Sequence, residues 1–192
     1  MLLVRHGETT WSASGRHTGR SDPPLTEAGV EAARRLGLWL AKQHVGRVLV
    51  SPLTRALETC QAAGFGGQAE VMDDLREWDY GDYEGMTTSA IRADRPGWSL
   101  WRDGCPHGED AGSVGRRADR VVAILRRAAE VVALFSHGHF LRVLTARWLE
   151  LAPAEGRLFG LDTGAVCALG YEREQPVIRL WNLTPDGQLV RI

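Results

Sequence analysis

The sequence predicts an α/β fold in which a mostly parallel mixed sheet carries helices on both faces, a three-layer αβα sandwich. Short apolar runs bounded by turn residues indicate strands, and apolar side chains at helical spacing lie between several of them. Strands that alternate with helices are typical of a parallel sheet covered on both faces. The last two apolar runs have no helix between them, so they predict an antiparallel hairpin that makes the sheet mixed.

The predicted strands are short, partly β-branched and bounded by turn residues. In chain order they are Leu2–Val4, Val48–Val50, the weaker candidate Ala69–Met72, Val131–Phe135, Ala165–Leu169 and Val177–Leu180. The final pair forms the predicted hairpin.

The predicted helices have recognisable start and stop signals. Thr26 is a preferred N-cap residue, and Pro52 suits the first position of a helix because its missing N–H has no partner there. Pro153 ends the last helix. The helices cover Thr26 to about Gln43, Ser51 to about Ala63, about Asp110–Ala129 and Gly138–Glu150.

The segment Asp73–Gly112 departs from this alternation. It is rich in glycine, proline and charged residues, and it contains Trp78, Trp98 and Trp101. Irregular segments of this length in compact domains are often functional, and the tryptophans favour an ordered structure because disordered segments are poor in aromatic residues. We expect this segment to cover the substrate and to set specificity.

The composition predicts one domain over residues 1–192. A formal net charge of -1 argues against nucleic acid or a membrane surface as the partner, since both require excess basic charge. We find no apolar stretch long enough for a signal peptide or a membrane span. Three cysteines without short pairing spacing favour a reducing, cytoplasmic location. The oligomeric state stays open, a homo-oligomer included.

Polar residues follow the predicted strands at the point where each strand ends. Arg5 and His6 follow the first strand, Arg55 lies after the second, Glu77 after the third and His137 after the fourth. Ligands bind at the carboxyl ends of strands in sheets of this kind. Two histidines, two arginines and a carboxylate are therefore expected to meet at one edge of the sheet.

Several sequence blocks in a fixed order carry a family resemblance. They are Leu3–Thr9, Gly15–Gly19, Pro24–Thr26, Ser51–Ala56, Leu75–Gly85 and Ser136–Gly138. Over about residues 2–145 the chain resembles the histidine phosphatase superfamily, also called the phosphoglycerate mutase-like family. Through Trp11-Ser12, Glu77–Gly85, Trp101–Cys105 and His137–His139 it is nearest the sedoheptulose-1,7-bisphosphatase-type sugar phosphatases. The resemblance implies a phosphoglycerate mutase-like fold and a phosphomonoesterase without a cofactor, acting on a small phosphorylated metabolite such as a sugar phosphate or bisphosphate.

The residues at the strand ends suit phosphoryl transfer. This reaction requires mainly that the phosphoryl group be held in line and that charge on its oxygens be stabilised. Arg5 and Arg55 have the fork geometry for this, and His137 can donate a further hydrogen bond. Neutral His6 is then the nucleophile and forms a phosphohistidine, while Glu77 protonates the leaving oxygen and later activates water. By resemblance these five residues take those roles.

Further residues are expected to contact the substrate. The resemblance places Thr18 and Gly19 in a phosphate-binding loop and Ser12 where asparagine is common in the family. Tyr80, Trp101, Arg102 and His139 are expected near the pocket mouth, with Arg102 or Arg142 available for a second anionic group. The alternative, that Trp101 only packs and both arginines are solvated, stays open. His137 and His139 lack a third ligand, so no metal is expected.

Other functions fit the sequence less well. The segment Cys167–Arg173 has the C-x5-R spacing of cysteine phosphatases. Its pattern predicts a strand, whereas that chemistry needs a phosphate-binding loop that leads into a helix. Leu134–Gly138 approaches a nucleophile elbow, yet no histidine follows His139 to complete a triad. A non-catalytic phosphate-binding module should lack His6 or Glu77. A phosphoglycerate mutase remains the alternative enzyme, although relatives of that kind are generally longer.

Overall fold

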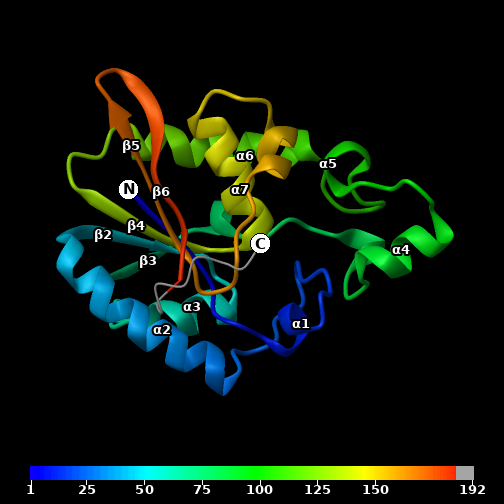
Figure 1. Ribbon diagram of the computed structural model, residues 1–192, viewed down its shortest axis with the longest axis horizontal. Helices are drawn as coiled ribbons and strands as arrows, with labels where there is room; N and C mark the ends of the chain where they lie inside the picture. The colour runs from blue at the N-terminus through cyan, green and yellow to red at the C-terminus, as the bar shows by residue number, and fades with distance from the viewer. Residues whose placement is uncertain (185–192) are drawn as a thin grey trace.

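The computed structural model describes residues 1–184 and places a six-stranded sheet between two layers of helices (Figure 1). Residues 185–192 of the predicted domain lie outside the described residues. The strand order across the sheet is β3-β2-β4-β1-β5-β6. The strands are β1 Leu2–Arg5, β2 Val45–Val50, β3 Ala69–Val71, β4 Val131–Ser136, β5 Val166–Glu172 and β6 Gln175–Leu183. Each of the predicted strands is confirmed, the weak candidate included.

The first four strands run parallel, and β5 and β6 form the predicted antiparallel hairpin. The register brings Arg5 beside Ser136 and Val50 beside Phe135. The carboxyl ends of β1, β2 and β4 are therefore level with one another. The residues that follow these strands meet at a single edge.

The helices begin and end near the predicted positions. They are α1 Thr10–Ala13, α2 Glu27–Leu40, α3 Thr54–Ala62, α4 Thr88–Asp94, α5 Leu100–Asp103, α6 Ala111–Leu125 and α7 Gly138–Trp148. Short 3₁₀ turns are η1 Ala41–Gln43, η2 Gly66–Gln68, η3 Asp73–Leu75, η4 Gly81–Tyr83 and η5 Pro153–Leu158. Thr26 caps α2 as predicted, because its hydroxyl accepts the N–H of Gly29 at 3.0 Å. Asp110 caps α6 in the same way by accepting the N–H of Ser113.

The predicted start of α3 is wrong by two residues. The helix begins at Thr54, with Leu53 at the N-cap, so Pro52 lies before it. The Ser51 hydroxyl accepts the N–H of Leu53 at 3.4 Å, but Leu53 is extended and the helix begins only after it. The same hydroxyl lies 2.7 Å from Nε2 of His137, on the neighbouring strand end, so a tertiary contact is added to the local one. The end of α6 also comes earlier than predicted, at Leu125.

The core forms two apolar layers, one on each face of the sheet. Side chains alternate along β1, so that Val4 faces α2 and α3 whereas Leu3 faces α6 and α7. On the first face Leu36, Leu40 and Cys60 pack on the sheet, and on the other face Val121, Phe140 and Leu144 do so. Figure 1 shows α2 and α3 on one side of the strands and α6 and α7 on the other. The three-layer prediction is confirmed.

The irregular segment is ordered and contains η3, η4, α4 and α5. Trp78 and Trp98 are buried, and each indole N–H donates to a carbonyl within the segment, of Glu109 and Gly104 respectively. Both side chains belong to the apolar layer between the sheet and α6 and α7, which anchors the segment to the main core. Within residues 1–184 no helix has the length and apolar character needed to cross a membrane.

Candidate active site

A cavity of about 270 Å³ opens at the carboxyl ends of β1 and β4. Its walls contain most of the residues predicted for the site and a few that were not predicted. They are Arg5, His6, Ser12, Gly15, Arg16, His17, Thr18, Glu77, Tyr80, Thr88 and His139. The predicted residues that do not line the cavity are Gly19, Arg55, Arg102 and His137.

His6 is held in one tautomer at the floor of the cavity. The side chain is buried, and Nδ1 lies 2.7 Å from the carbonyl oxygen of Gly7. Since a carbonyl oxygen only accepts, Nδ1 carries the hydrogen and Nε2 keeps its lone pair. Burial lowers the pKa of His6 well below its usual value, and the charges of Arg5 and Arg55 lower it further. His6 is therefore a neutral imidazole with a nucleophilic nitrogen at neutral pH.

The turn after His6 packs directly against the start of α2. A Cβ atom on Gly29 would lie 2.4 Å from the carbonyl oxygen of Glu8, and one on Gly7 would lie 2.7 Å from the carbonyl oxygen of Gly29. Only glycine allows the two backbones to approach so closely. The N–H of Gly7 donates to the hydroxyl of Thr59 on α3. Two helices thus fix the turn that carries His6.

Arg5 and Arg55 lie on either side of His6 and bond to backbone carbonyls. Arg5 donates through Nη1 to Leu161, and its guanidinium packs against Gly138, where a Cβ atom would lie 3.1 Å away. Arg55 is fully buried. Its terminal nitrogens donate to the carbonyl oxygens of Thr18, Gly19 and Ser21 and to Asp22. Arg55 can therefore donate to an anion through Nε, which has no partner. Its terminal nitrogens can do so only if they release the loop carbonyls.

His137 stands beside His6 as the N-cap residue of α7, with ring centroids 5.2 Å apart. Burial lowers its pKa well below the usual value, and the charge of Arg55 adds to this effect. Nε2 is bonded to the Ser51 hydroxyl. When that hydroxyl donates, the ring hydrogen lies on Nδ1, which makes Nδ1 a donor.

Three buried donor atoms around His6 have no partner. Among the described residues, the buried side-chain nitrogens and oxygens without a hydrogen bond are Arg5 Nε, Arg55 Nε, His137 Nδ1 and Trp148 Nε1. An unpartnered buried polar atom costs about 1–3 kcal/mol, so such atoms are rare and call for an explanation. All but the Trp148 atom belong to the predicted phosphoryl-binding residues. These donors match the oxygens of a small anion.

The carboxylate of Glu77 is held by backbone N–H groups at the start of α7. Oε1 accepts the N–H groups of Trp78 and Phe140 at 2.9 and 2.8 Å, and Oε2 accepts the N–H of His139 at 3.0 Å. The first N–H groups of a helix have no intrahelical partner, so a carboxylate is well placed there. The side chain is 6% exposed and reaches the cavity. Its position is defined by backbone groups instead of flexible side chains.

An uncharged aromatic wall closes one side of the cavity. The Tyr80 hydroxyl lies 2.7 Å from Nδ1 of His139, and the ring of His17 stacks 4.7 Å from that of Tyr80. Burial raises the pKa of Tyr80 well above its usual value and lowers that of His139. Burial also lowers the pKa of His17 to about 4. At neutral pH this wall carries hydrogen-bonding groups without charge.

The predicted phosphate loop is engaged in internal contacts. The hydroxyl of Ser12 forms a capping box with Thr9, and that of Thr18 donates to the carbonyl of Arg16. The N–H of Gly19 donates to the carboxylate of Glu84 at 2.9 Å. Ser12 and Thr18 remain at the cavity wall, whereas Gly19 does not line it.

The structure does not bring Arg102 to the cavity. Its guanidinium is exposed and pairs with the neighbouring Asp103, 2.8 Å away, and it also donates to the carbonyl of Gly97. The local ion pair holds the side chain on the surface. Arg102 therefore joins Gly19 as a predicted substrate contact that does not line the cavity.

Sequence reasoning missed Arg16, His17 and Thr88 as cavity residues. The first two lie inside the Gly15–Gly19 block, so their position in a phosphate-binding loop was the available signal. Thr88 begins α4 in the irregular segment, and only its contact of 3.2 Å with His17 reveals its place. Within residues 1–184, no group of three His, Cys, Asp or Glu side chains is arranged to hold a metal ion.

Comparisons with known proteins show the family to which the chain is similar. The family profile of the histidine phosphatase superfamily (branch 1) matches residues 1–184. An acid phosphatase of Mycobacterium tuberculosis is 40% identical over 98% of this chain and 94% of that protein, and the sedoheptulose 1,7-bisphosphatase of Saccharomyces cerevisiae is 36% identical over 78% and 67%. The solved structure of a Mycobacterium tuberculosis open reading frame product superposes with a TM-score of 0.91 at 40% identity, covering 96% of this chain and 97% of that one.

Proposed function

The chain belongs to the histidine phosphatase superfamily (branch 1), and from that premise we propose that it hydrolyses a phosphate monoester through a phosphohistidine at His6. The observation that carries the proposal is the set of unpartnered buried donors on Arg5, Arg55 and His137 around a neutral imidazole. A phosphoryl group presents oxygens to all three donors and its phosphorus to the nucleophile.

The first step transfers the phosphoryl group to the enzyme. Nε2 of His6 forms a bond to phosphorus while the bond from phosphorus to the ester oxygen breaks. Protonated Glu77 gives its proton to that oxygen, which leaves as an alcohol. Arg5, Arg55 and His137 stabilise the charge on the remaining phosphoryl oxygens.

The second step restores the enzyme. A water molecule in the cavity attacks phosphorus, and the carboxylate of Glu77 takes a proton from it. The bond between phosphorus and Nε2 breaks, which returns the electron pair to His6 and releases phosphate. Glu77 is then protonated again for the next cycle, so protons balance over the two steps.

The cavity supports a sugar phosphate as the substrate. Its volume of about 270 Å³ suits a small metabolite, and the wall offers hydroxyl and neutral imidazole groups from Tyr80, His17, Thr88 and His139. Such groups match the hydroxyls of a sugar. Arg16 adds an exposed guanidinium at the same cavity. A second anionic group on the substrate, as in a bisphosphate, has this cation available.

Replacement of the proposed acid tests the mechanism. Glu77→Gln keeps the size of the side chain and removes the transferable proton, so kcat/KM should fall by about 10²-fold or more for sugar phosphates. With p-nitrophenyl phosphate, kcat/KM should fall much less, because its leaving group, p-nitrophenolate, departs without being protonated. An equal loss with both substrates would contradict the role of Glu77.

A substrate panel tests the substrate class. Phosphorylated metabolites are assayed for phosphate release, with 3-phosphoglycerate mutase activity measured in parallel. The proposal expects release from sugar phosphates or bisphosphates and no mutase turnover. Mutase turnover without phosphate release would identify the alternative enzyme instead.

A further inference from the structure

Arg117, on α6, binds the main chain that leads to Glu77. Its guanidinium donates to the carbonyl oxygens of Asp74 and Arg76 at 2.8 and 3.0 Å and to that of Glu77 at 3.3 Å. The remaining N–H groups donate to both carboxylate oxygens of Glu109, at 2.9 and 2.8 Å. All five N–H groups of the guanidinium are thereby used, which no lysine reproduces.

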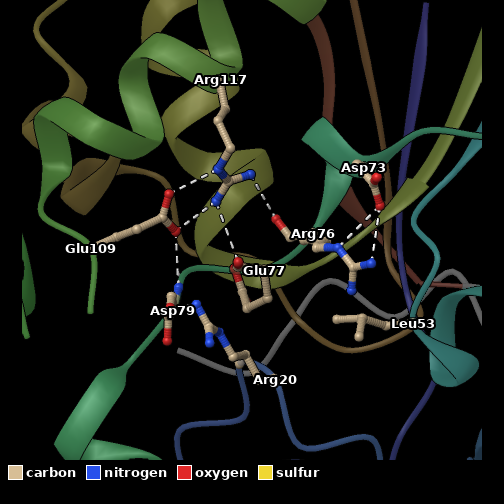
Figure 2. A pocket seen from close by; sticks show the side chains of 9 residues that line it. Arg20, Leu53, Asp73, Arg76, Glu77, Asp79, Glu109 and Arg117 are labelled. Atoms are coloured by element: carbon tan, nitrogen blue, oxygen red, sulfur yellow. Dashed lines mark hydrogen bonds and ion pairs between the residues drawn. The ribbon is translucent and has the colours of Figure 1, made fainter. Parts of the chain in front are cut away.

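Glu109 binds the chain on the other side of Glu77. Oε2 accepts the N–H of Asp79 at 3.0 Å, and the backbone carbonyl of Glu109 accepts the indole N–H of Trp78 at 2.9 Å. The ion pair of Glu109 with Arg117 is bidentate and largely buried, with side-chain exposures of 19% and 15%. Together the two residues hold the segment 74–79 from both ends. Figure 2 shows their contacts with Arg76, Glu77 and Asp79.

The same guanidinium also touches the helix that fixes the carboxylate of Glu77. Its central carbon lies 5.0 Å from the ring centroid of Phe140, and the N–H of Phe140 donates to Glu77 Oε1. Arg117 thus contacts both the main chain of Glu77 and the first turn of α7. A shift of Arg117 changes the distance between the carboxylate and its N–H donors.

Arg117 and Glu109 lie behind Glu77, away from the reacting atoms. They line a second cavity of about 220 Å³, together with Arg20, Asp79 and others (Figure 2). Glu77 lines both cavities, whereas Arg117 and Glu109 do not line the cavity of His6. The pKa of His137 is lowered mainly by burial, and the charge of Arg117 contributes to this effect. A substitution that keeps the positive charge leaves that contribution in place, so its geometric effect on the reaction acts through Glu77, which lines both cavities.

We propose that Arg117, paired with Glu109, is a positioning residue that aims the carboxyl group of Glu77 at the leaving oxygen of the substrate. The inference rests on the proposed function, in which Glu77 is the proton donor. Displacement of a catalytic group by about 1 Å can lower the rate by about 10²-fold. Loss of Arg117 should therefore resemble a partial loss of the acid.

The test compares leaving groups in Arg117→Lys, which keeps the positive charge but loses the fork geometry. We measure kcat/KM, which reports the steps up to the phosphoenzyme, on a series of phosphate esters from p-nitrophenyl phosphate to a sugar phosphate. The value of kcat/KM should fall about tenfold for the sugar phosphate and should change little for p-nitrophenyl phosphate. A merely structural role lowers the amount of folded enzyme and hence both values equally, and that result would overturn the inference.

Arg120→Lys is the matched control on the same helix. Arg120 bonds to the side chain of Asp74 and the carbonyl of Arg116, and it makes no bond to the main chain of residues 76–79. Its replacement should leave the dependence on the leaving group unchanged. Glu109→Gln is the second variant, in case Arg117→Lys does not fold, and the same selective loss is expected.

The double variant Glu77→Gln/Arg117→Lys separates this inference from the function on which it rests. With the acid already removed, Arg117→Lys should cause no further loss that depends on the leaving group. An additional selective loss would show that Arg117 acts independently of Glu77 and would overturn the inference. If Glu77→Gln alone shows no selectivity, the proposed role of Glu77 fails, and the inference fails with it.

Discussion

His6 illustrates how a few contacts determine the chemistry of a residue. One carbonyl oxygen, that of Gly7, places the ring hydrogen on Nδ1, while burial and two nearby guanidinium groups keep the ring neutral. An ordinary imidazole has a pKa of about 6.5 and is partly charged near neutral pH. The lowered pKa removes that fraction of charge, so Nε2 keeps its lone pair at neutral pH, as the proposed role of His6 requires.

Arg16 carries a prediction about substrates with two anionic groups. Arg16→Ala should raise KM for a sugar bisphosphate by about fivefold, because one solvated ion pair is worth about 1 kcal/mol. KM for p-nitrophenyl phosphate should change little. Arg102→Ala is the control, since Arg102 pairs with Asp103 away from the cavity. Steady-state kinetics on both substrates check the prediction, and a larger effect from Arg102 would contradict it.

Residues that follow strands could be predicted, and residues placed by long-range contacts could not. His6 and Glu77 follow predicted strands, and the level strand ends bring them to one cavity. Arg102 is an exception, because Asp103, which holds it on the surface, is its neighbour in the sequence and the pairing could have been considered. The N–H of Gly19 is bonded to Glu84, 65 residues along the chain, and no local pattern indicates such a partner.

At the scale of elements, alternation and caps predicted most of the sheet and helices. Thr26 caps α2 as expected because N-capping depends only on neighbours within three residues. The start of α3 was misplaced because Leu53 is extended, although the Ser51 hydroxyl accepts its N–H and also bonds to His137 from another strand. The close approach of α2 to the turn after β1 could not be predicted either, since it depends on Gly7 and Gly29 from separate segments.

That close approach carries a prediction about stability. Gly29→Ala should lower the free energy of unfolding by about 1–3 kcal/mol, because the new Cβ atom would meet the carbonyl oxygen of Glu8 and force the turn that carries His6 to shift. Activity should fall as well. Gly67→Ala is the control, as nothing lies within 4 Å of its Cβ position. Denaturant unfolding of both variants measures the difference, and equal stabilities would contradict the account.

At the scale of the whole molecule, a formal net charge of -1 coexists with a concentrated positive site. Of the 23 Lys and Arg residues, Lys42 is the only lysine, and several arginines are exposed on helices, such as Arg34, Arg116 and Arg120. Arg55, fully buried, and Arg5, half-buried, lie instead close to His6. A near-neutral chain can therefore attract a small anion at one point without attracting a polyanion.

The buried histidines make stability depend on pH. Burial lowers the pKa values of His6, His17, His137 and His139 in the folded protein, so below pH 6.5 the unfolded chain binds protons that the folded protein does not. The free energy of unfolding should fall as pH falls from 6.5 to about 5, by roughly 1.4 kcal/mol per pH unit for each such histidine. Urea unfolding between pH 7 and pH 5 measures this slope.

His17 offers the clearest check of that slope, since its pKa is about 4 in the folded protein. The contribution of neutral His17 to the free energy of unfolding is complete above pH 6.5 and is lost progressively as the pH falls to about 4. His17→Asn should therefore flatten the dependence of stability on pH. An unchanged slope in the variant, or constant stability in the wild-type protein over this range, would contradict the assignment of these neutral rings.

The central claim is that His6 carries the phosphoryl group, and direct trapping of the phosphoenzyme tests it. The protein is mixed with labelled substrate, quenched with alkali to preserve a bond between phosphorus and nitrogen, digested and mapped by mass spectrometry. We expect label on the peptide that contains His6, lost on treatment with acid, and no label or turnover in His6→Ala. Label on another residue, or substantial turnover by His6→Ala, would contradict the account.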